Sequence, residues 1–539
     1  MFKHIGTKYR QNLIFIVVIS LLLIGMESYF RYSSPLLELF TRAREYLFVV
    51  IVVLLASFSN RRLALAFLTF IVTFIAIQLA HYNYFGTLLF PMEIYLGFTK
   101  QHEIIDTIST MTKILIVPVT LWLIALFVVI MIDRKTKGRQ RYRWVSVIFV
   151  LILIFPIIRT SVGYKKHQLG ERPNELWSLA RNSIAVTDHF LGKTLPLLLL
   201  DKSTIPPWQE KVFVHDANSS VQNIVLIIGE SLTSKHMSLY GYEKETTPYL
   251  DALAKQHKII YRQGLSAGVV TDSSIPMIIN SAQKANALVH IINGTNNLFK
   301  FAQSEGYHTY FITAQSQEAL KYIRTYLHPN YIDTYMDSSA AGYDYFSIAH
   351  DDVLVRDFQK IPLKNRKNFI VLNMAGSHSP YQAEVPVGYK PFGDKKIVDQ
   401  YDNSVHYSDL ILHQLFAQAE KLSEVSTLFL FTSDHGELVS EEGFGHGRLD
   451  KESVYNVPLI LYPVHTKLRE EIGQLLTKSR YATHYELALI VADVLGYKSI
   501  RSDYKTPYKA YINGRDLNGV DGFMTVDYNQ TAIMKREIH

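Results

Sequence analysis

Cysteine is absent from this chain of 539 residues. Its absence excludes disulfide bonds, thiolate zinc sites, iron–sulfur clusters and cysteine nucleophiles. Any bound metal must therefore use His, Asp, Glu or hydroxyl ligands. Internal repeats and low-complexity tracts are also lacking. The length exceeds that of one ordinary domain, so we expect two or three domains.

Long apolar runs, in contrast, recur through the first 161 residues. Most of them approach the roughly 20 residues that a helix needs to cross a bilayer. Because four further runs follow the first, we expect that first run to be a membrane span and not a cleaved signal. The predicted spans are Asn12–Tyr29, Tyr46–Ser59, Leu63–Tyr82, Ile114–Ile132 and Trp144–Ile158.

Basic residues predict the orientation of these five spans. The whole chain has a net charge of +7, and residues 1–161 hold 17 Lys and Arg against 7 Asp and Glu. These basic residues gather before the first span, between spans two and three, and between spans four and five. Five spans put all three segments on one side, which the positive-inside rule makes cytoplasmic. The charge therefore indicates membrane topology and not nucleic-acid binding.

Residues 162–215 are a predicted connector between two domains, 1–161 and 216–539. Within the connector, Glu171–Leu191 has apolar residues at helical spacing, and we expect this helix to lie along the membrane surface. Two prolines, Pro206 and Pro207, mark the end of the connector.

From Val221 onward, short apolar strands alternate with helices. This alternation predicts an α/β domain whose mainly parallel sheet is covered by helices. Ligands of such sheets bind beyond the carboxyl ends of the strands. The predicted strands are Asn223–Ile228, Thr309–Ile312, Asn368–Leu372, Thr427–Phe431 and Val457–Tyr462, and the predicted helices are Thr247–Gln256, Ser404–Glu420 and Tyr481–Leu495.

Polar side chains follow several of these strands. Glu230 follows the first strand, Asp434, His435 and Glu437 follow Thr427–Phe431, and His378 follows Asn368–Leu372. A further histidine, His446, lies between two glycines. Each residue alone is more often structural than catalytic. Together they form a ligand set suited to zinc or manganese.

A candidate nucleophile lies in the segment Ser266–Pro276. Gly268 permits an unusual turn there, and Thr271 can begin a short helix whose N-terminal N–H groups favour a phosphate. The alternative is that Thr271 only caps this helix, with help from Ser273 and Ser274.

The order of these motifs resembles the alkaline phosphatase/sulfatase superfamily. With five N-terminal spans, the chain resembles the bacterial phosphoethanolamine transferases over nearly its full length. The resemblance implies a five-helix transmembrane domain and a periplasmic sulfatase-like domain, in a multi-pass protein of the bacterial inner membrane. The matching motifs are Asn223–Glu230, Thr246–Leu250, the Thr271 segment, Tyr401–Ser404, Tyr407–Asp409, Ser433–Glu437 and Gly445–Gly447.

The resemblance also implies roles for individual residues. Glu230, Thr271, Asp434 and His435 match the ligands of one or two Zn²⁺ ions, with Mn²⁺ as an alternative metal. Thr271 matches the nucleophile that becomes covalently modified. The matching residues with other catalytic or substrate-binding roles are His378, His446, Glu437, Gln315 and Lys321.

The implied reaction moves phosphoethanolamine from phosphatidylethanolamine to lipopolysaccharide or lipooligosaccharide. The family's lipid A enzymes usually carry cysteines near the nucleophile, where this chain has Ala267 and Met277. The acceptor is therefore left open between a core sugar and lipid A. Two alternatives remain: a phosphoglycerol transferase acting on a cell-envelope glycan, and a non-catalytic, membrane-anchored binding protein. A hydrolytic sulfatase is disfavoured because no modified Cys or Ser motif surrounds Thr271.

Overall fold

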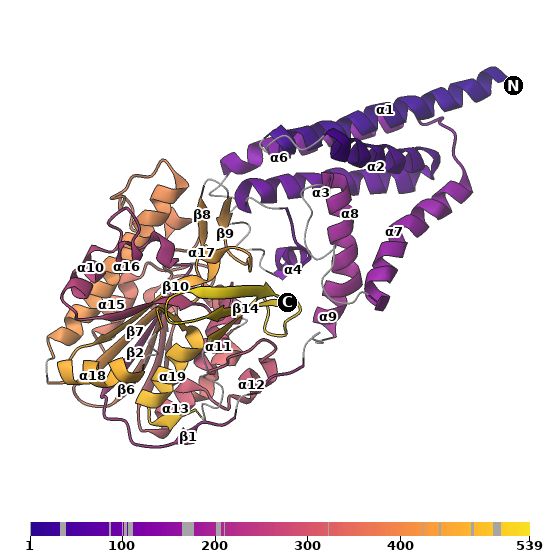
Figure 1. Ribbon diagram of the computed structural model, residues 1–539. Helices are drawn as coiled ribbons and strands as arrows, with labels where there is room; N and C mark the ends of the chain where they lie inside the picture. Colours follow the sequence, from indigo (N-terminus) through magenta and orange to yellow (C-terminus); the bar gives the residue numbers. More distant parts are fainter. Residues whose placement is uncertain are drawn as a thin grey trace. The chain divides into compact units, whose positions relative to one another are not determined.

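The computed structural model contains two compact units, residues 1–200 and residues 201–539 (Figure 1). The first unit is helical, and the second is an α/β unit. The predicted start of the connector helix at Glu171 lies outside the described residues. The structure describes residues 2–32, 39–85, 88–99, 101, 105, 112–163, 177–200, 206–209, 211–321, 323–422, 424–440, 443–475, 479–499 and 508–539.

Within the described part of the first unit, four helices are long and apolar enough to cross a membrane, by length and composition. The second predicted span coincides with α2 (Leu39–Phe58), which is not among the four. The count of five spans therefore stays a prediction. The four helices are α1 (Phe2–Tyr32), α3 (Arg61–Phe85), α6 (Thr112–Lys135) and α7 (Arg143–Gly163).

Buried polar contacts join the loops at one end of the helical unit. The backbone N–H of Gln140, in the loop between α6 and α7, donates to Asn12 Oδ1 over 2.8 Å. Asp133 accepts from Arg61 Nε at 2.8 Å and from Arg139 Nη1 at 3.0 Å. The three basic segments thus lie at the same end of the unit, as the predicted topology requires. The side of the membrane that this end faces stays a prediction.

Short helices lie between and after the long ones in the same unit. The N-terminus of α8 is fixed by two buried carboxylates, because Leu179 N donates to Glu27 Oε2 over 2.5 Å and Ser178 N donates to Glu45 Oε2 over 3.1 Å. Carboxylates are favourable there because the first N–H groups of a helix lack partners. The short helices are α4 (Pro91–Thr99), α8 (Leu179–His189), the π-helical turn η1 (Phe190–Thr194) and α9 (Leu195–Leu199).

The second unit is built on an eight-stranded mixed sheet of order β11-β3-β10-β7-β2-β6-β4-β5. Strands β7, β2, β6, β4 and β5 are parallel, and β10 is antiparallel to both of its neighbours. All five predicted strands are present. The strands are β2 (Asn223–Gly229), β3 (Ile260–Leu265), β4 (His308–Thr313), β5 (Thr334–Met336), β6 (Asn368–Asn373), β7 (Thr427–Ser433), β10 (Asn456–Pro463) and β11 (Tyr481–Thr483).

Both faces of this sheet are apolar. Helices cover each of them (Figure 1). Along β2, Ile224, Leu226 and Ile228 face one buried core while Val225 and Ile227 face the other, because strand side chains alternate. One core includes α11 (Thr271–Ile279), α13 (Leu298–Ser304) and α19 (His484–Val494). The other includes α10 (Pro248–Lys255), α15 (Asp352–Phe358) and α16 (Ile397–Glu420).

The predicted helix Tyr481–Leu495 is shorter than expected. Its first three residues form β11, and α19 begins only at His484. Thr483 and Glu486 form a capping box that starts the helix there, because each side chain accepts from the other residue's backbone N–H. This local hydrogen bonding overrides the apolar spacing on which the prediction relied.

Several further elements were not predicted. A second sheet of three strands follows the main sheet in the chain, and a small hairpin, β8–β9, follows β7. These elements are β1 (Val214–His215), β8 (Leu438–Ser440), β9 (Gly443–Gly445), β12 (Tyr497–Lys498), β13 (Tyr508–Asn513), β14 (Phe523–Tyr528), β15 (Ile533–Ile538), α12 (Leu288–Asn293), α14 (Gln317–Leu320), α17 (Glu452–Tyr455) and α18 (Thr466–Leu475).

Candidate metal centre

The carboxyl ends of β2 and β7 lie side by side because these strands are parallel neighbours. Glu230 follows the last residue of β2, and Asp434 and His435 follow the last residue of β7. Thr271 is the first residue of α11. The fold therefore brings together four residues that are up to 205 positions apart in the chain.

The four side chains are within contact distance of one another. Thr271 Oγ1 donates to Asp434 Oδ2 over 2.6 Å and lies 3.0 Å from Glu230 Oε2 and 3.4 Å from His435 Nε2. His435 Nδ1 donates to the carbonyl of Gly436 at 2.9 Å, which directs Nε2 toward the carboxylates. Glu230, Asp434 and His435 are almost completely buried. One oxygen or nitrogen from each is available to a common metal ion.

Electrostatics explain why this group suits a cation. Burial and the charge of Glu230 raise the pKa of Asp434 to about 7. Burial opposes the charge on His435, yet Asp434 and Glu230 raise its pKa to about 10. Burial works against the charge of Glu230 also, but His435 holds the pKa of that carboxyl well below its usual range. Two buried carboxylates thus depend on positive charge nearby, and the donor set fits zinc.

The backbone directly after Glu230 has an unusual conformation. Ser231 has a φ of 55°, in the left-handed region that non-glycine residues rarely adopt. Two contacts hold it there: its N–H donates to Asp434 Oδ1 at 3.1 Å, and its Oγ donates to Glu230 Oε1 at 2.9 Å. Such conformations persist only where surrounding contacts fix them, which is common at functional sites.

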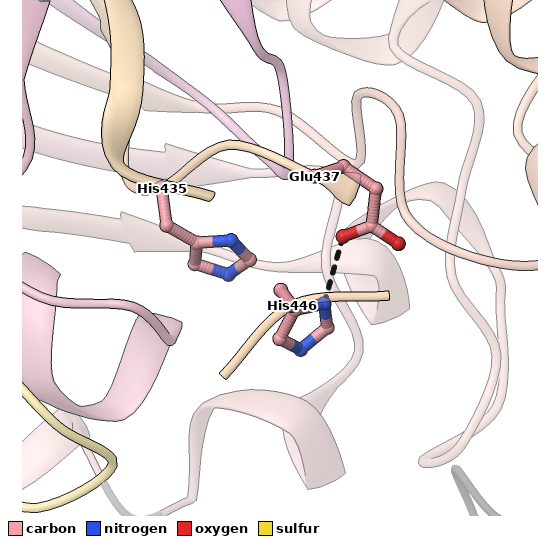
Figure 2. Close-up of side chains that lie close together, drawn as sticks. All are labelled: His435, Glu437 and His446. Carbon is pink, nitrogen blue, oxygen red and sulfur yellow. Dashed lines mark hydrogen bonds and ion pairs between the residues drawn. The ribbon is translucent and has the colours of Figure 1, made fainter. Parts of the chain in front are cut away.

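A second group of side chains adjoins the first (Figure 2). His446 Nδ1 lies 2.9 Å from Glu437 Oε2, and Tyr381 donates its hydroxyl to the other carboxylate oxygen at 2.7 Å. The His446 ring is 4.4 Å from that of His435 and 5.8 Å from that of His378, measured between centroids. His435, Glu437 and His446 also offer ligand atoms close enough to share a metal ion.

The other predicted residues differ in their placement. Gln315 Nε2 donates to Glu230 Oε2 at 3.3 Å and to the carbonyl of Met374 at 3.1 Å, so Gln315 belongs to the centre. Lys321 instead forms an ion pair with Glu318 at 2.6 Å, and its side chain is one-third exposed. The proposed roles of both residues in substrate binding stay predictions.

Two residues near the centre were missed by the sequence analysis. Asp351 accepts from the backbone N–H groups of Ala375 and Gly376 at 2.7 and 3.1 Å, and burial raises its pKa to about 7. It has no motif that could have revealed it. Tyr381 follows His378 by three residues, so its nearness in the chain was the one available signal.

Comparison with known proteins agrees with this arrangement. The sulfatase family profile matches residues 222–497, and the chain belongs to this family. The resemblance to the alkaline phosphatase/sulfatase superfamily is thereby confirmed. Over 441 residues, 78% of each chain, it is 24% identical to phosphoethanolamine transferase EptA of Helicobacter pylori (strain ATCC 700392 / 26695).

Other relatives match over a shorter stretch. The chain is 27% identical to YhbX of Escherichia coli (strain K12) over 312 residues, and it spans about half of that protein's length (52%) and 55% of its own. It is 23% identical over 324 residues to the Kdo(2)-lipid A phosphoethanolamine 7''-transferase of Salmonella typhimurium, covering 56% of each chain.

One solved structure has the same fold over most of the chain. The integral membrane protein lipooligosaccharide phosphoethanolamine transferase A from Neisseria meningitidis matches with a TM-score of 0.59 at 15% identity. The match covers 90% of this chain and 96% of that one. The combination of N-terminal apolar helices and a sulfatase-like α/β unit is therefore a fold that this membrane protein shares.

Proposed function

We propose that this protein is a metal-dependent phosphoethanolamine transferase of the bacterial inner membrane. Its donor is phosphatidylethanolamine, and its acceptor is a core sugar or lipid A of lipopolysaccharide or lipooligosaccharide. The observation that carries the proposal is the position of Thr271. This residue begins α11, and its hydroxyl contacts both Glu230 and Asp434. The names of the relatives support the group that is transferred.

Glu230, Thr271, Asp434 and His435 would hold zinc. A bound zinc ion supplies positive charge beside Thr271 Oγ1 and lowers the pKa of that hydroxyl, which is otherwise a weak nucleophile. Asp434 Oδ2, at 2.6 Å, accepts from the hydroxyl and orients it, and the hydroxyl proton would be released to solvent as the metal binds. The first N–H groups of α11 lie beside the phosphoryl oxygens, where they stabilise negative charge.

Transfer takes two displacement steps at phosphorus. Thr271 Oγ1 first forms a bond to the phosphorus of the donor, and the bond to the diacylglycerol oxygen breaks. His378 or His446 gives a proton to that oxygen, so diacylglycerol leaves as a neutral alcohol. An acceptor hydroxyl then gives its proton to the same histidine and attacks the phosphorus, which frees Thr271 Oγ1. These two successive displacements predict ping-pong kinetics.

Replacing the nucleophile tests the proposal. We expect Thr271→Ala to abolish both the covalent adduct and transfer, because no other hydroxyl of the described residues bonds to both Glu230 and Asp434. Thr271→Ser keeps the hydroxyl and part of the activity. Intact-protein mass spectrometry detects the adduct, and mass spectrometry of lipopolysaccharide from cells with and without the gene identifies the transferred group and its position. Undiminished transfer by a folded Thr271→Ala protein would overturn the proposal. A glycerol phosphate adduct on Thr271 would instead identify the protein as a phosphoglycerol transferase.

A further inference from the structure

The loop that leads into Thr271 is held from two sides at Ala267. On one side, the backbone N–H of Ala267 donates to His484 Nδ1 over 3.0 Å. On the other side, its carbonyl accepts from the backbone N–H of Asn513 at 2.8 Å and from Asn513 Nδ2 at 2.9 Å. All three residues are buried. His484 begins α19 and Asn513 ends β13, so the two supports come from separate elements.

The same strand end also connects the two catalytic loops. The backbone N–H of Val269 donates to the carbonyl of Asn513 at 3.2 Å, and the carbonyl of Val269 accepts from the N–H of Gly447 at 2.9 Å. Val269 precedes Thr271 by two residues, and Gly447 directly follows His446. One residue of β13 is therefore linked through Val269 to both the nucleophile and the histidine.

The loop needs such external support because of its glycine. A Cβ at Gly268 would lie 2.1 Å from Ser273 Oγ and 3.0 Å from Ser273 Cβ, so a larger residue fits only if Ser273 moves. Glycine leaves the backbone more conformational freedom than any other residue. The chain has no cysteine with which to cross-link the loop. Hydrogen bonds to neighbouring elements are then the means of fixing it.

His484 is suited to a permanent acceptor role. Burial lowers the pKa of His484 to about 3, so its ring is neutral at physiological pH. Because Nδ1 accepts from Ala267, the proton of the neutral ring lies on Nε2, which faces Thr432 Oγ1 at 3.0 Å. Both ring nitrogens thus have partners in the described residues.

We propose that His484 and Asn513 are positioning residues for the transfer reaction. By fixing Ala267 and Val269, they hold Thr271 and His446 at the separation that the reaction needs. Asn513 lies beyond residues 222–497, so this part of the machinery falls outside the stretch matched by the sulfatase family. The inference rests on the proposed role of Thr271. Its test also includes a measurement, hydrogen exchange, that does not depend on that role.

Single-turnover kinetics on the full-length protein test the proposal. The rate of Thr271 adduct formation is measured as a function of the concentration of phosphatidylethanolamine in mixed micelles. We expect Asn513→Ala and His484→Leu to lower the maximal rate by about 10- to 100-fold with little change in half-saturating donor concentration, since small misplacements of reacting groups cost about that much. His484→Asn should recover most of the rate, because its Oδ1 can accept in place of Nδ1.

A buried asparagine elsewhere in the same unit provides the matched control. Asn297 caps α13 and donates through Nδ2 to Asn280 Oδ1 at 3.0 Å, at the opposite end of α11 from Thr271. Asn297→Ala should lose comparable stability but keep its rate. Equal rate losses in Asn297→Ala and Asn513→Ala, at equal melting temperature, would overturn the proposal. So would a His484→Asn variant that is as slow as His484→Leu.

Hydrogen exchange gives a readout that is independent of the donor. Asn513→Ala should reduce amide protection in peptides containing Val269 and Gly447, whereas Asn297→Ala should not. If wild type forms no adduct with phosphatidylethanolamine, the proposed function fails while the exchange result still decides whether Asn513 fixes both loops. Unchanged protection in both peptides would show that it does not.

Discussion

At the scale of single residues, His446 depends on a carboxylate that the sequence motif alone did not assign to it. Glu437 is fully buried and accepts through one oxygen from Tyr381 while the other lies 2.9 Å from His446 Nδ1. A carboxylate held on both sides fixes the orientation of the imidazole, so Nε2 is the nitrogen left for substrate or metal (Figure 2).

Removing the charge of Glu437 should slow transfer. Because Glu437→Gln preserves the shape but weakens the orientation of His446, we expect kcat to fall by about 10- to 100-fold, the usual cost of losing a partner that orients a functional histidine. Tyr381→Phe, which removes one hydrogen bond to the same carboxylate, should have a smaller effect. Steady-state kinetics on protein of measured zinc content separates this effect from metal loss. A Glu437→Gln enzyme with wild-type kcat would contradict the orienting role.

At the scale of elements, the centre depends on how closely the ends of neighbouring strands approach. Gly376, in the loop after β6, has a φ of 59°, and a Cβ there would lie 2.8 Å from both the N and O of Glu230. Two N–H groups of this loop are held by Asp351. The loop therefore packs against the backbone of a metal ligand, and only glycine permits that approach.

Substituting this glycine should displace Glu230. We expect Gly376→Ala to weaken zinc binding and transfer strongly, since the added methyl group meets backbone that cannot rotate away. Gly306→Ala is the control, because Gly306 also has a positive φ, 77°, but no atom within 4 Å of a built Cβ. Both variants should lose about 1 kcal/mol of stability from the left-handed conformation. Zinc titration measures the affinity of each variant, and thermal unfolding measures its stability. Equal zinc affinity in Gly376→Ala and Gly306→Ala would refute the steric argument.

At the scale of the whole molecule, metal and protons compete for the same buried site. Without metal, the pKa of Asp434 is raised to about 7 and that of His435 to about 10. A metal ion must therefore displace protons from these ligands at neutral pH. Its binding becomes more favourable as pH rises, because fewer protons remain to be released.

Metal removal should show this linkage. We expect chelation to abolish transfer and to lower the melting temperature of the second unit, and zinc to restore both. The apparent affinity for zinc should rise between pH 6 and pH 8 by about tenfold per pH unit for each proton displaced. Competition with a chelator whose zinc affinity is known at each pH measures the apparent affinity of the protein for zinc. Transfer that survives complete metal removal would exclude a metal-dependent reaction, and a pH-independent affinity would exclude proton release.

The sequence predicted five strands of the main sheet and the side chains that gather at their ends, because these signals are local. An apolar run followed at once by Glu230 or by Asp434 and His435 is visible in one stretch of chain. The antiparallel direction of β10 was not predicted, since an apolar run carries no record of its pairing partner. The role of Lys321 came from the resemblance alone, although its spacing of three residues from Glu318 suits an ion pair within one helical turn.

By itself, the sequence determined the membrane-type helices, the α/β character of the second unit and the donor set of the candidate metal centre. All of these depend on composition and on order along the chain. Only the tertiary structure decided that Tyr381, His484 and Asn513 support this centre. Asn513 lies 246 residues from Ala267 and His484 lies 217 residues from it, so their hydrogen bonds leave no periodicity or motif in the sequence. Such contacts exist only once the sheet and its helices have brought those segments together.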